Sequence, residues 1–314
     1  RRARISTSAR WRYWRASASY DFGISDGWKT TTIQYAGFRK QRITAGNQVA
    51  AFSMEDLTSS AQLPMLERSV ASQLSPGLLQ GLSYRTWRDR WGFQVGIYGD
   101  ELNDLDRRRF EGRGVAGRFT FAPVLNEQTA VHLGAATEYR SAKDKPVRLK
   151  ARPGSRLAEN RLIDTRNIDG IDDGWTTGLE LAASHRNLRV QSEAILMSLD
   201  GAGGDLEFNS QYLMVSAVLG GETYRYSPSR GVFKGVRPHA GWGSVELAAR
   251  IARLDLDDDP VSGGEQIETT IGANWILTED LKAMFNFTDI EASPNSRGVD
   301  EDVTLISVRL QYDM

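Results

Sequence analysis

Arginine is the residue whose number and spacing most suggest chemistry in this chain. The 314 residues include 32 arginines and 7 lysines against 40 acidic residues, giving a formal net charge of −1. The guanidinium group binds phosphate and carboxylate through paired hydrogen bonds, so arginines gathered on one surface would hold anions. Because the net charge is close to zero, we also expect many arginines to lie beside Asp and Glu.

Other kinds of chemistry have little support in the residue types. The absence of cysteine excludes disulfides, zinc–thiolate sites and thiol nucleophiles. The three histidines (His132, His185 and His239) lie far apart, and no G-x-S-x-G, P-loop or H-E-x-x-H motif occurs. We therefore expect no enzymatic activity, no cofactor or metal and no nucleic-acid partner. The aspartates of LDLDDDP (254–260) could offer oxygen ligands to Ca²⁺, but they lack EF-hand spacing and are expected to form a solubilising turn.

Residues 241–256, GWGSVELAARIARLDL, raise the question of which element positions these arginines. Its residues favour a helix, yet position parity separates Val245, Leu247, Ala249 and Ile251 from Ser244, Glu246, Ala248, Arg250 and Ala252. The same period of two recurs in 3–11, 91–97, 115–121, 131–140, 267–275, 281–288 and 306–312, with turn signals between the segments. A lone helix would interrupt this series, so the stretch is predicted to be a strand.

About 15 or 16 such strands are typical of a mid-sized transmembrane β-barrel. A closed ring of this size leaves an interior too wide for side chains alone to fill, which suits a face rich in charge. Aromatic residues at strand ends, such as Trp11, Trp91 and Trp275, fit interfacial girdles, and long loops are expected at 48–77, 140–173, 226–239 and 291–301. The alternative is a large soluble β-protein whose apolar face packs into a core.

Several segments along the whole chain carry a family resemblance. They are RRARI (1–5), YDFG (20–23), FSMEDLTSS (52–60), MLERS (65–69), GRFTFAPV (117–124), VHLGA (131–135), VRLKARPGSRLAENRLIDT (147–165), GVF (231–233), GWGSVELAARIARLDL, GGEQ (263–266) and GANWILTEDLKAMFNF (272–287). Together they resemble the phosphate-selective porin O/P family. The resemblance implies one domain over residues 1–314, an outer-membrane barrel of 16 strands in a Gram-negative bacterium. It also implies a trimer that passes anions such as phosphate or polyphosphate.

The resemblance further implies an inward loop that constricts the pore. In the family this loop follows an early strand, which corresponds here to residues 48–77, and its charged residues are Glu55, Asp56, Glu67 and Arg68. Two features depart from the family. Its members normally have another strand before RRAR, so the N-terminal strand is expected to be missing or clipped, and the C-terminal residues after Tyr312 are atypical.

If the apolar parity faces lipid, the opposite parity faces the lumen. The basic residues on that side are Arg2, Arg4, Arg10, Arg15, Arg42, Arg85, Arg118, Arg140, Arg189, Arg250, Lys282 and Arg309. Cationic side chains along a low-dielectric wall concentrate anions and favour their passage. From this set, the candidate anion pathway comprises Arg4, Arg10, Arg42, Arg85, Arg118, Arg250, Lys282 and Arg309. The competing interpretation is that these residues pair with carboxylates on the same face: Asp21, Glu138, Glu180, Glu193, Glu246 and Glu268.

The charges near the expected constriction are mixed. Between residues 41 and 86 only Arg42, Arg68 and Arg85 are basic, which predicts a general or weakly anion-preferring porin rather than strict phosphate selectivity. The first half of loop 140–173 is basic (Arg140, Lys143, Lys145, Arg148, Lys150, Arg152 and Arg156) and would meet anionic solutes or lipopolysaccharide if it faced outward. The alternative functions are a barrel that acts mainly as a scaffold or surface partner, with a narrowed pore, and a soluble β-rich binding protein.

Overall fold

One antiparallel sheet contains most of the chain. The computed structural model describes residues 3–23, 27–103, 108–142, 146–201, 203–239, 241–294, 298 and 300–313, so Arg2, Lys143 and Lys145 lie outside the described residues. Neighbouring strands follow the chain in the order β1 (Arg4–Trp11), β2 (Trp14–Asp21), β4 (Thr31–Tyr35), β5 (Gln41–Val49), β6 (Leu78–Trp87), β7 (Trp91–Tyr98), β9 (Gly112–Phe121), β10 (Thr129–Ala142), β13 (Ile171–His185), β14 (Leu188–Gly201), β15 (Leu206–Leu219), β18 (Ser244–Asp258), β19 (Val261–Ile276), β20 (Leu281–Ala292) and β21 (Val303–Tyr312). The short strand β3 (Gly27–Trp28) pairs with β2 and completes a sheet of 16 strands.

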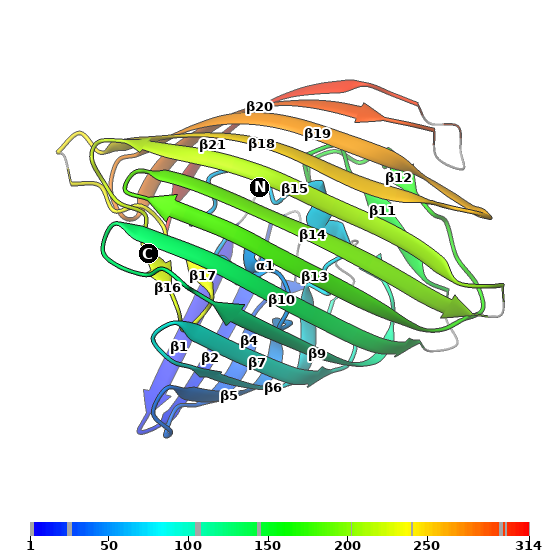
Figure 1. Cartoon of the computed structure of the whole chain (residues 1–314), viewed down its shortest axis with the longest axis horizontal. Coiled ribbons are helices and arrows are strands. Elements are labelled where there is room, and N and C mark those ends of the chain that lie inside the picture. Colours follow the sequence, from blue (N-terminus) through cyan, green and yellow to red (C-terminus); the bar gives the residue numbers. More distant parts are fainter. Residues whose placement is uncertain are drawn as a thin grey trace.

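The stretch whose parity was ambiguous is a strand. β18 pairs with β15 on one side and with β19 on the other, which satisfies its backbone groups along both edges. Its prediction as a strand from the period of two is therefore confirmed. Figure 1 shows the sheet curving as a barrel wall around segments that lie inside it, among them α1 (Met54–Leu57). The expected fold class, an antiparallel β-barrel with an inward loop, is confirmed.

The two faces of the sheet differ as the alternation requires. In β13 buried and exposed residues alternate, and the exposed ones in the middle of the strand include the apolar Leu179 and Leu181. Trp175, Trp242 and Trp275 are exposed near strand ends, where amphipathic rings suit a membrane interface. Among the described residues, no helix is both long and apolar enough to span a membrane.

The segment between β5 and β6 folds inside the wall, as expected for residues 48–77. It contains α1 and the 3₁₀-helix η1 (Val70–Gln73), and its apolar residues Phe52, Met54, Met65 and Leu74 are almost fully buried. Phe52, Met65 and Leu74 pack with lumen-facing apolar side chains such as Phe208 and Met214 in one core, whereas Met54 belongs to another core. That packing explains why β15 has apolar residues on both of its faces.

A second inner segment enters from the same end of the barrel. β11 (Arg148–Ala151) pairs with β8 (Arg108–Arg109) and β12 (Ile163–Asp164) in a small sheet. Its residues Leu149 and Ile163 are buried in the core that also holds Leu74. The idea that loop 140–173 faces outward is therefore wrong for this part of the loop, because its apolar alternation is buried inside the barrel.

A third inner segment enters from the opposite end. The connection between β15 and β18 forms a hairpin of β16 (Tyr226–Ser227) and β17 (Val232–Phe233), and Figure 1 shows this hairpin on the left of the barrel, with β11 and β12 on the right. Val232 and Phe233 are buried against Met54 of α1. The inward loop is thus contacted from both ends of the barrel.

Candidate functional site

Wall carboxylates hold the first turn of α1. Glu193 on β14 accepts hydrogen bonds from the backbone nitrogens of Met54 (2.9 Å) and Glu55 (2.8 Å), and from the Tyr212 hydroxyl (2.6 Å). The Ser53 hydroxyl caps the same turn by accepting from Asp56 N at 3.2 Å. Glu193 therefore positions the inward loop rather than facing open solvent.

The basic residues of β18, β20 and β21 also anchor this loop. Arg250 donates to the Glu55 carboxylate (3.3 Å) and to the Glu67 carbonyl (3.0 Å). Lys282 donates to the carbonyls of Ala61 and Leu63, and Arg309 donates to that of Leu66 at 3.0 Å. All three residues lie on the lumen face as expected, and all three use donor groups to hold the loop.

Arg118 on β9 holds the hairpin of β16 and β17, which enters from the opposite end of the barrel. Its guanidinium forms a double hydrogen bond with Glu180, at 2.7 Å for each contact, and donates to the carbonyls of Arg230 (2.9 Å) and Gly231 (2.7 Å). His132 bridges Glu180 (2.8 Å) and the Tyr226 hydroxyl (2.6 Å). Burial raises the pKa of Tyr226, so its phenol stays protonated and can donate to His132 Nδ1. The neutral imidazole then has Nε2–H available for Glu180.

A different arrangement occurs on the first strands of the sheet. Arg10 and Arg15 face each other across β1 and β2 and are exposed, and Arg42 and Arg85 face each other across β5 and β6. Direct pairing of Arg85 with Gln94, and of Gln94 with Arg118, places Arg85 and Arg42 on the lumen face. Arg15 and Arg10 share this face, because Arg15 pairs with Gln34 and Gln34 with Thr44, two residues from Arg42. Among the described residues, none of these four arginines donates a hydrogen bond to an inner segment; Arg42 donates to the carbonyls of Phe38 and Gln41.

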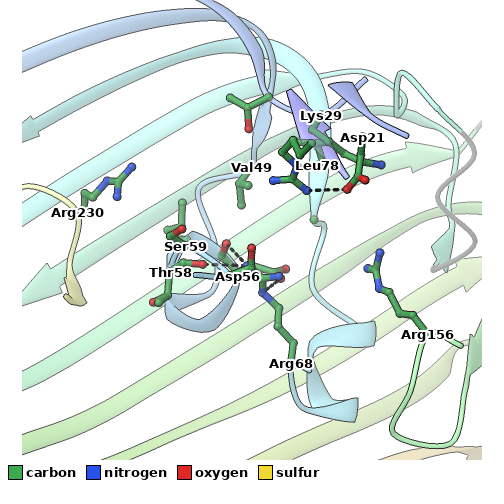
Figure 2. Close-up of a pocket in the computed structure, with 15 residues that line it drawn as sticks. Asp21, Lys29, Val49, Asp56, Thr58, Ser59, Arg68, Leu78, Arg156 and Arg230 are labelled. Carbon is green, nitrogen blue, oxygen red and sulfur yellow. Dashed lines mark hydrogen bonds and ion pairs between the residues drawn. The ribbon is translucent and has the colours of Figure 1, made fainter. Parts of the chain in front are cut away.

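The inward loop borders a cavity of about 300 Å³ beside the first strands, which none of these four arginines lines. The lining basic residues are Arg4, Lys29, Arg68, Arg156 and Arg230, and the lining acids are Asp21 and Asp56. Each acid pairs with a lining arginine, since Arg4 lies 3.2 Å from Asp21 and Arg68 lies 3.1 Å from Asp56. Figure 2 shows Arg156 and Arg230 reaching the cavity from opposite sides of the view, with Asp56 and Arg68 between them.

The structure brings together only part of the predicted site. Arg4, Asp56 and Arg68 line the cavity, whereas Glu55 is buried within the inward loop, where it accepts from the Ser69 hydroxyl at 2.7 Å. Glu67 does not line the cavity; its carbonyl accepts from Arg250. The sequence analysis missed Lys29 and Arg230 as site residues because they lie in connections, where no period of two indicates which way a side chain points. Arg156 was named only as a residue of a loop that would meet anions if it faced outward, and it instead lines the cavity.

A second cavity, of about 280 Å³, lies at the other end of the inward loop, next to Ala61 and Gln62. Its charged lining is balanced: Arg225, Lys234, Arg237 and Lys282 against Glu246, Glu279, Asp280 and Asp313. Arg237 and Glu279 form an ion pair at 3.0 Å. This cavity therefore has no surplus of positive lining residues, unlike the first one.

The described residues contain no group of three or more His, Asp or Glu side chains arranged to hold a metal ion. The aspartates of 255–259 act in the turn between β18 and β19, where Asp257 accepts from Gly264 N (2.7 Å) and Asp258 accepts from Glu207 N (2.7 Å). These carboxylates stabilise the ends of neighbouring strands.

Comparison with known proteins gives consistent matches. The family model described as "Phosphate-selective porin O and P" matches residues 1–314. A protein of uncharacterized function from Caulobacter vibrioides is 26% identical over 293 residues, which cover 86% of this chain and 59% of that protein. Porin O of Pseudomonas aeruginosa is 24% identical over 347 residues, covering 94% of this chain and 76% of the relative. The chain thus spans little more than half the length of the first of these relatives.

Solved structures with a similar fold are outer-membrane proteins and porins. The trimer form of OmpT from Vibrio cholerae superposes with a TM-score of 0.58 at 10% identity, over 99% of this chain and 91% of that one. An anion-selective porin from Comamonas acidovorans has a TM-score of 0.55 at 15% identity, over 99% of this chain and 88% of that one. At these identities the likeness concerns the fold.

Proposed function

Because the chain belongs to the phosphate-selective porin O and P family, we propose that it forms a passive diffusion channel for small anionic solutes. The protein is an outer-membrane β-barrel of a Gram-negative bacterium. The observation that carries the proposal is the cavity beside the inward loop, which five basic and two acidic residues line among those described. A surplus of cations next to a low-dielectric wall raises the local concentration of anions.

The geometry suggests how an anion passes. Arg10, Arg15, Arg42 and Arg85 follow the lumen face of the first strands, and the cavity adds Lys29, Arg156 and Arg230 from connections. Several weak sites in series let an ion exchange between neighbours and leave, where one tight site would retain it. We assign Arg118, Arg250, Lys282 and Arg309 to holding the inner segments rather than to the anion pathway.

Phosphate belongs to the proposed solutes, and polyphosphate follows from the same family resemblance. The cavity contains two ion-paired carboxylates, and only one of its basic residues is a lysine. This mixed lining supports a preference for anions in general over strict selection of phosphate. The proposed function involves no catalytic step. In this proposal, the proteins of similar fold are also regarded as channels.

The surroundings of the barrel follow from its outer face. Exposed apolar residues such as Ile251 and Ile271 would contact lipid, and a homotrimer is proposed by analogy with the trimeric OmpT. Contact with lipopolysaccharide is proposed only for the rim of the barrel, since the part of loop 140–173 that the structure describes as β11 and β12 is turned inward.

A scaffold function is the second candidate, and one observation favours it. Three inner segments enter the barrel, from both ends, and their apolar residues pack against β13–β15 and β18. A barrel filled in this way could serve a surface partner with little conduction.

Single-channel recording in a planar bilayer separates the two functions. We expect stepwise conductance and an anion-selective reversal potential in a salt gradient, with block of the chloride current by added phosphate. Conductance without anion preference would contradict the proposed anion pathway. Folded protein, identified by heat-dependent gel migration, that does not conduct would favour the scaffold.

A further inference from the structure

The short turns between the first strands form a continuous rim at one end of the barrel. Ala36 N in the β4–β5 turn donates to the Tyr13 carbonyl in the β1–β2 turn at 2.8 Å. Trp87 N, at the start of the β6–β7 turn, donates to the Lys40 carbonyl in the β4–β5 turn at 3.2 Å. Antiparallel pairing of these strands places all three turns at the same end. In membrane barrels the short turns face the periplasm.

These three turns, residues 12–13, 36–40 and 88–90, carry a surplus of positive charge, and we call them the basic rim. Their charged residues are five basic ones and one acidic one: Arg12, Arg39, Lys40, Arg88, Arg90 and Asp89. Asp89 pairs with Lys40. The surplus therefore comes from the four arginines, all of which are exposed on the surface.

The other short turns at this end of the barrel have the opposite balance of charge. They are residues 122–128, 186–187 and 277–280, and their charged residues are Arg186, Glu127, Glu279 and Asp280. The first of these turns adjoins the basic rim, because Ala122 N donates to the Arg90 carbonyl at 2.6 Å. The positive charge is thus confined to the turns of β1–β7, and the sign changes along the same end of the barrel.

Tryptophan rings lie directly beside two arginines of the basic rim. The guanidinium carbon of Arg12 is 5.2 Å from the centroid of the Trp11 ring, and that of Arg88 is 5.7 Å from the centroid of the Trp91 ring. Both rings have the parity of lipid-facing residues such as Phe93 on β7. Tryptophan rings at strand ends occupy the membrane interface, and a cation stacked on such a ring lies at the level of the lipid headgroups.

We propose that the basic rim binds the headgroups of anionic glycerophospholipids in the leaflet on the periplasmic side of the membrane. The rings of Trp11 and Trp91 contact the glycerol region of the same lipids. A lipid is the occupant because the charges stand beside rings that face the bilayer, where a soluble acidic protein would reach the charges but not the rings. An anionic headgroup is favoured over a zwitterionic one, since each basic residue near an anionic surface adds to the attraction. The inference depends on the membrane fold and not on conduction.

Brominated lipids test this proposal in vesicles that contain equal amounts of phosphatidylglycerol and phosphatidylcholine. Bromine on the acyl chains quenches nearby tryptophans, and Trp11, Trp14, Trp87 and Trp91 lie at the strand ends that the basic rim joins. We expect more quenching when phosphatidylglycerol carries the bromine than when phosphatidylcholine does. The difference should shrink at 1 M salt, where the screening length is about 3 Å. Equal quenching at low salt would overturn the proposal and leave the basic rim to a soluble acidic partner.

R12Q and R186Q form a matched pair of variants. Each removes an exposed arginine from a short turn at the same end of the barrel, and the two residues have nearly the same left-handed backbone, with φ of 51° and 52°. We expect R12Q to lower the ratio of the two lipid association constants about fivefold, as the loss of one basic residue near an anionic surface requires. R186Q should leave the ratio unchanged. Heat-dependent gel migration checks that both variants are folded.

Two results would contradict the assignment to the basic rim. One is an R12Q ratio equal to that of the wild type, and the other is an equal loss in R186Q. Inorganic phosphate that replaces chloride at constant ionic strength is expected to leave the ratio unchanged. A lipid preference abolished by inorganic phosphate would mean that the basic rim holds the free ion, which would also overturn the proposal.

Discussion

The two halves of the barrel wall use arginine in opposite ways. On β1–β6 the lumen-facing arginines Arg10 and Arg15 are exposed, and Arg42 and Arg85 are half-buried without a carboxylate partner among the described residues. Arg4 is the exception, since it pairs with Asp21. On β9–β18 the lumen-facing arginines Arg118 and Arg250 are buried and bound to Glu180 and Glu55. Both halves have the same alternation in sequence, but among these arginines only Arg250 and Arg118 of the second half donate hydrogen bonds to inner segments.

This difference shows that a charged side chain on the lumen face is not always available to a solute. A buried guanidinium needs a partner because removing it from water is costly, so each inner segment that covers the wall also brings acceptors to it. Glu55 and the carbonyls of Glu67 and Leu66 come from the inward loop for this reason. The arginines that remain available to solutes are those that no segment covers.

The largest effect on stability is expected when the carboxylate charge of the buried Arg118–Glu180 ion pair is removed. E180Q leaves the buried Arg118 without its counter-ion and should lower the free energy of unfolding by about 3–5 kcal/mol. Denaturant unfolding in detergent micelles measures this change. The control is E207Q, an exposed residue of β15, which should unfold as the wild type does. An E180Q variant of wild-type stability would mean that the two halves do not differ in this respect.

Removing an anchor of the inward loop should have a smaller effect on stability. R250Q should cost about 2 kcal/mol, because Glu55 keeps its contacts with Ser69 and only the bonds from Arg250 are lost. Channel recordings should show a changed conductance as the loop loosens, with little change in ion preference. A shift of ion preference as large as that expected for R42E would contradict the comparison between the two halves of the wall.

Charge reversal on the open wall should change selectivity instead of stability. R42E should move the ratio of anion to cation permeability about fivefold toward cations, which corresponds to about 1 kcal/mol. Reversal potentials in a salt gradient give this ratio, and R88E in the exposed turn is the matched control. An unchanged ratio in R42E would remove this residue from the pathway.

The smallest effect is expected at Arg10, an exposed position on β1. R10Q should change the same ratio by less than about twofold, and only at low ionic strength, because at 0.1 M salt the screening length is about 10 Å. Recordings at two salt concentrations would detect this dependence. A large effect that persists at high salt would show that Arg10 lies closer to the ion than its exposure suggests.

The faces of the strands were predictable from sequence, residue by residue. Arg42, Arg85, Arg118 and Arg250 all lie on the lumen face that parity assigned to them. The inward course of residues 48–77 was expected only from the family resemblance. The buried course of β11 and the hairpin of β16 and β17 were not anticipated, since their short apolar runs gave no sign of what would cover them.

What the sequence determined by itself is the alternation, because the pleat of a strand sends successive side chains to opposite faces whatever lies elsewhere in the chain. What only the tertiary structure decided is which arginines remain available. That outcome depends on contacts between distant residues, such as Arg250 with Glu55, which are 195 positions apart. It also depends on the hairpin of β16 and β17, which brings the Arg230 carbonyl to Arg118 on the wall. These two residues are more than a hundred positions apart in the chain. No local pattern encodes such meetings, since they follow from the packing of inner segments against the wall.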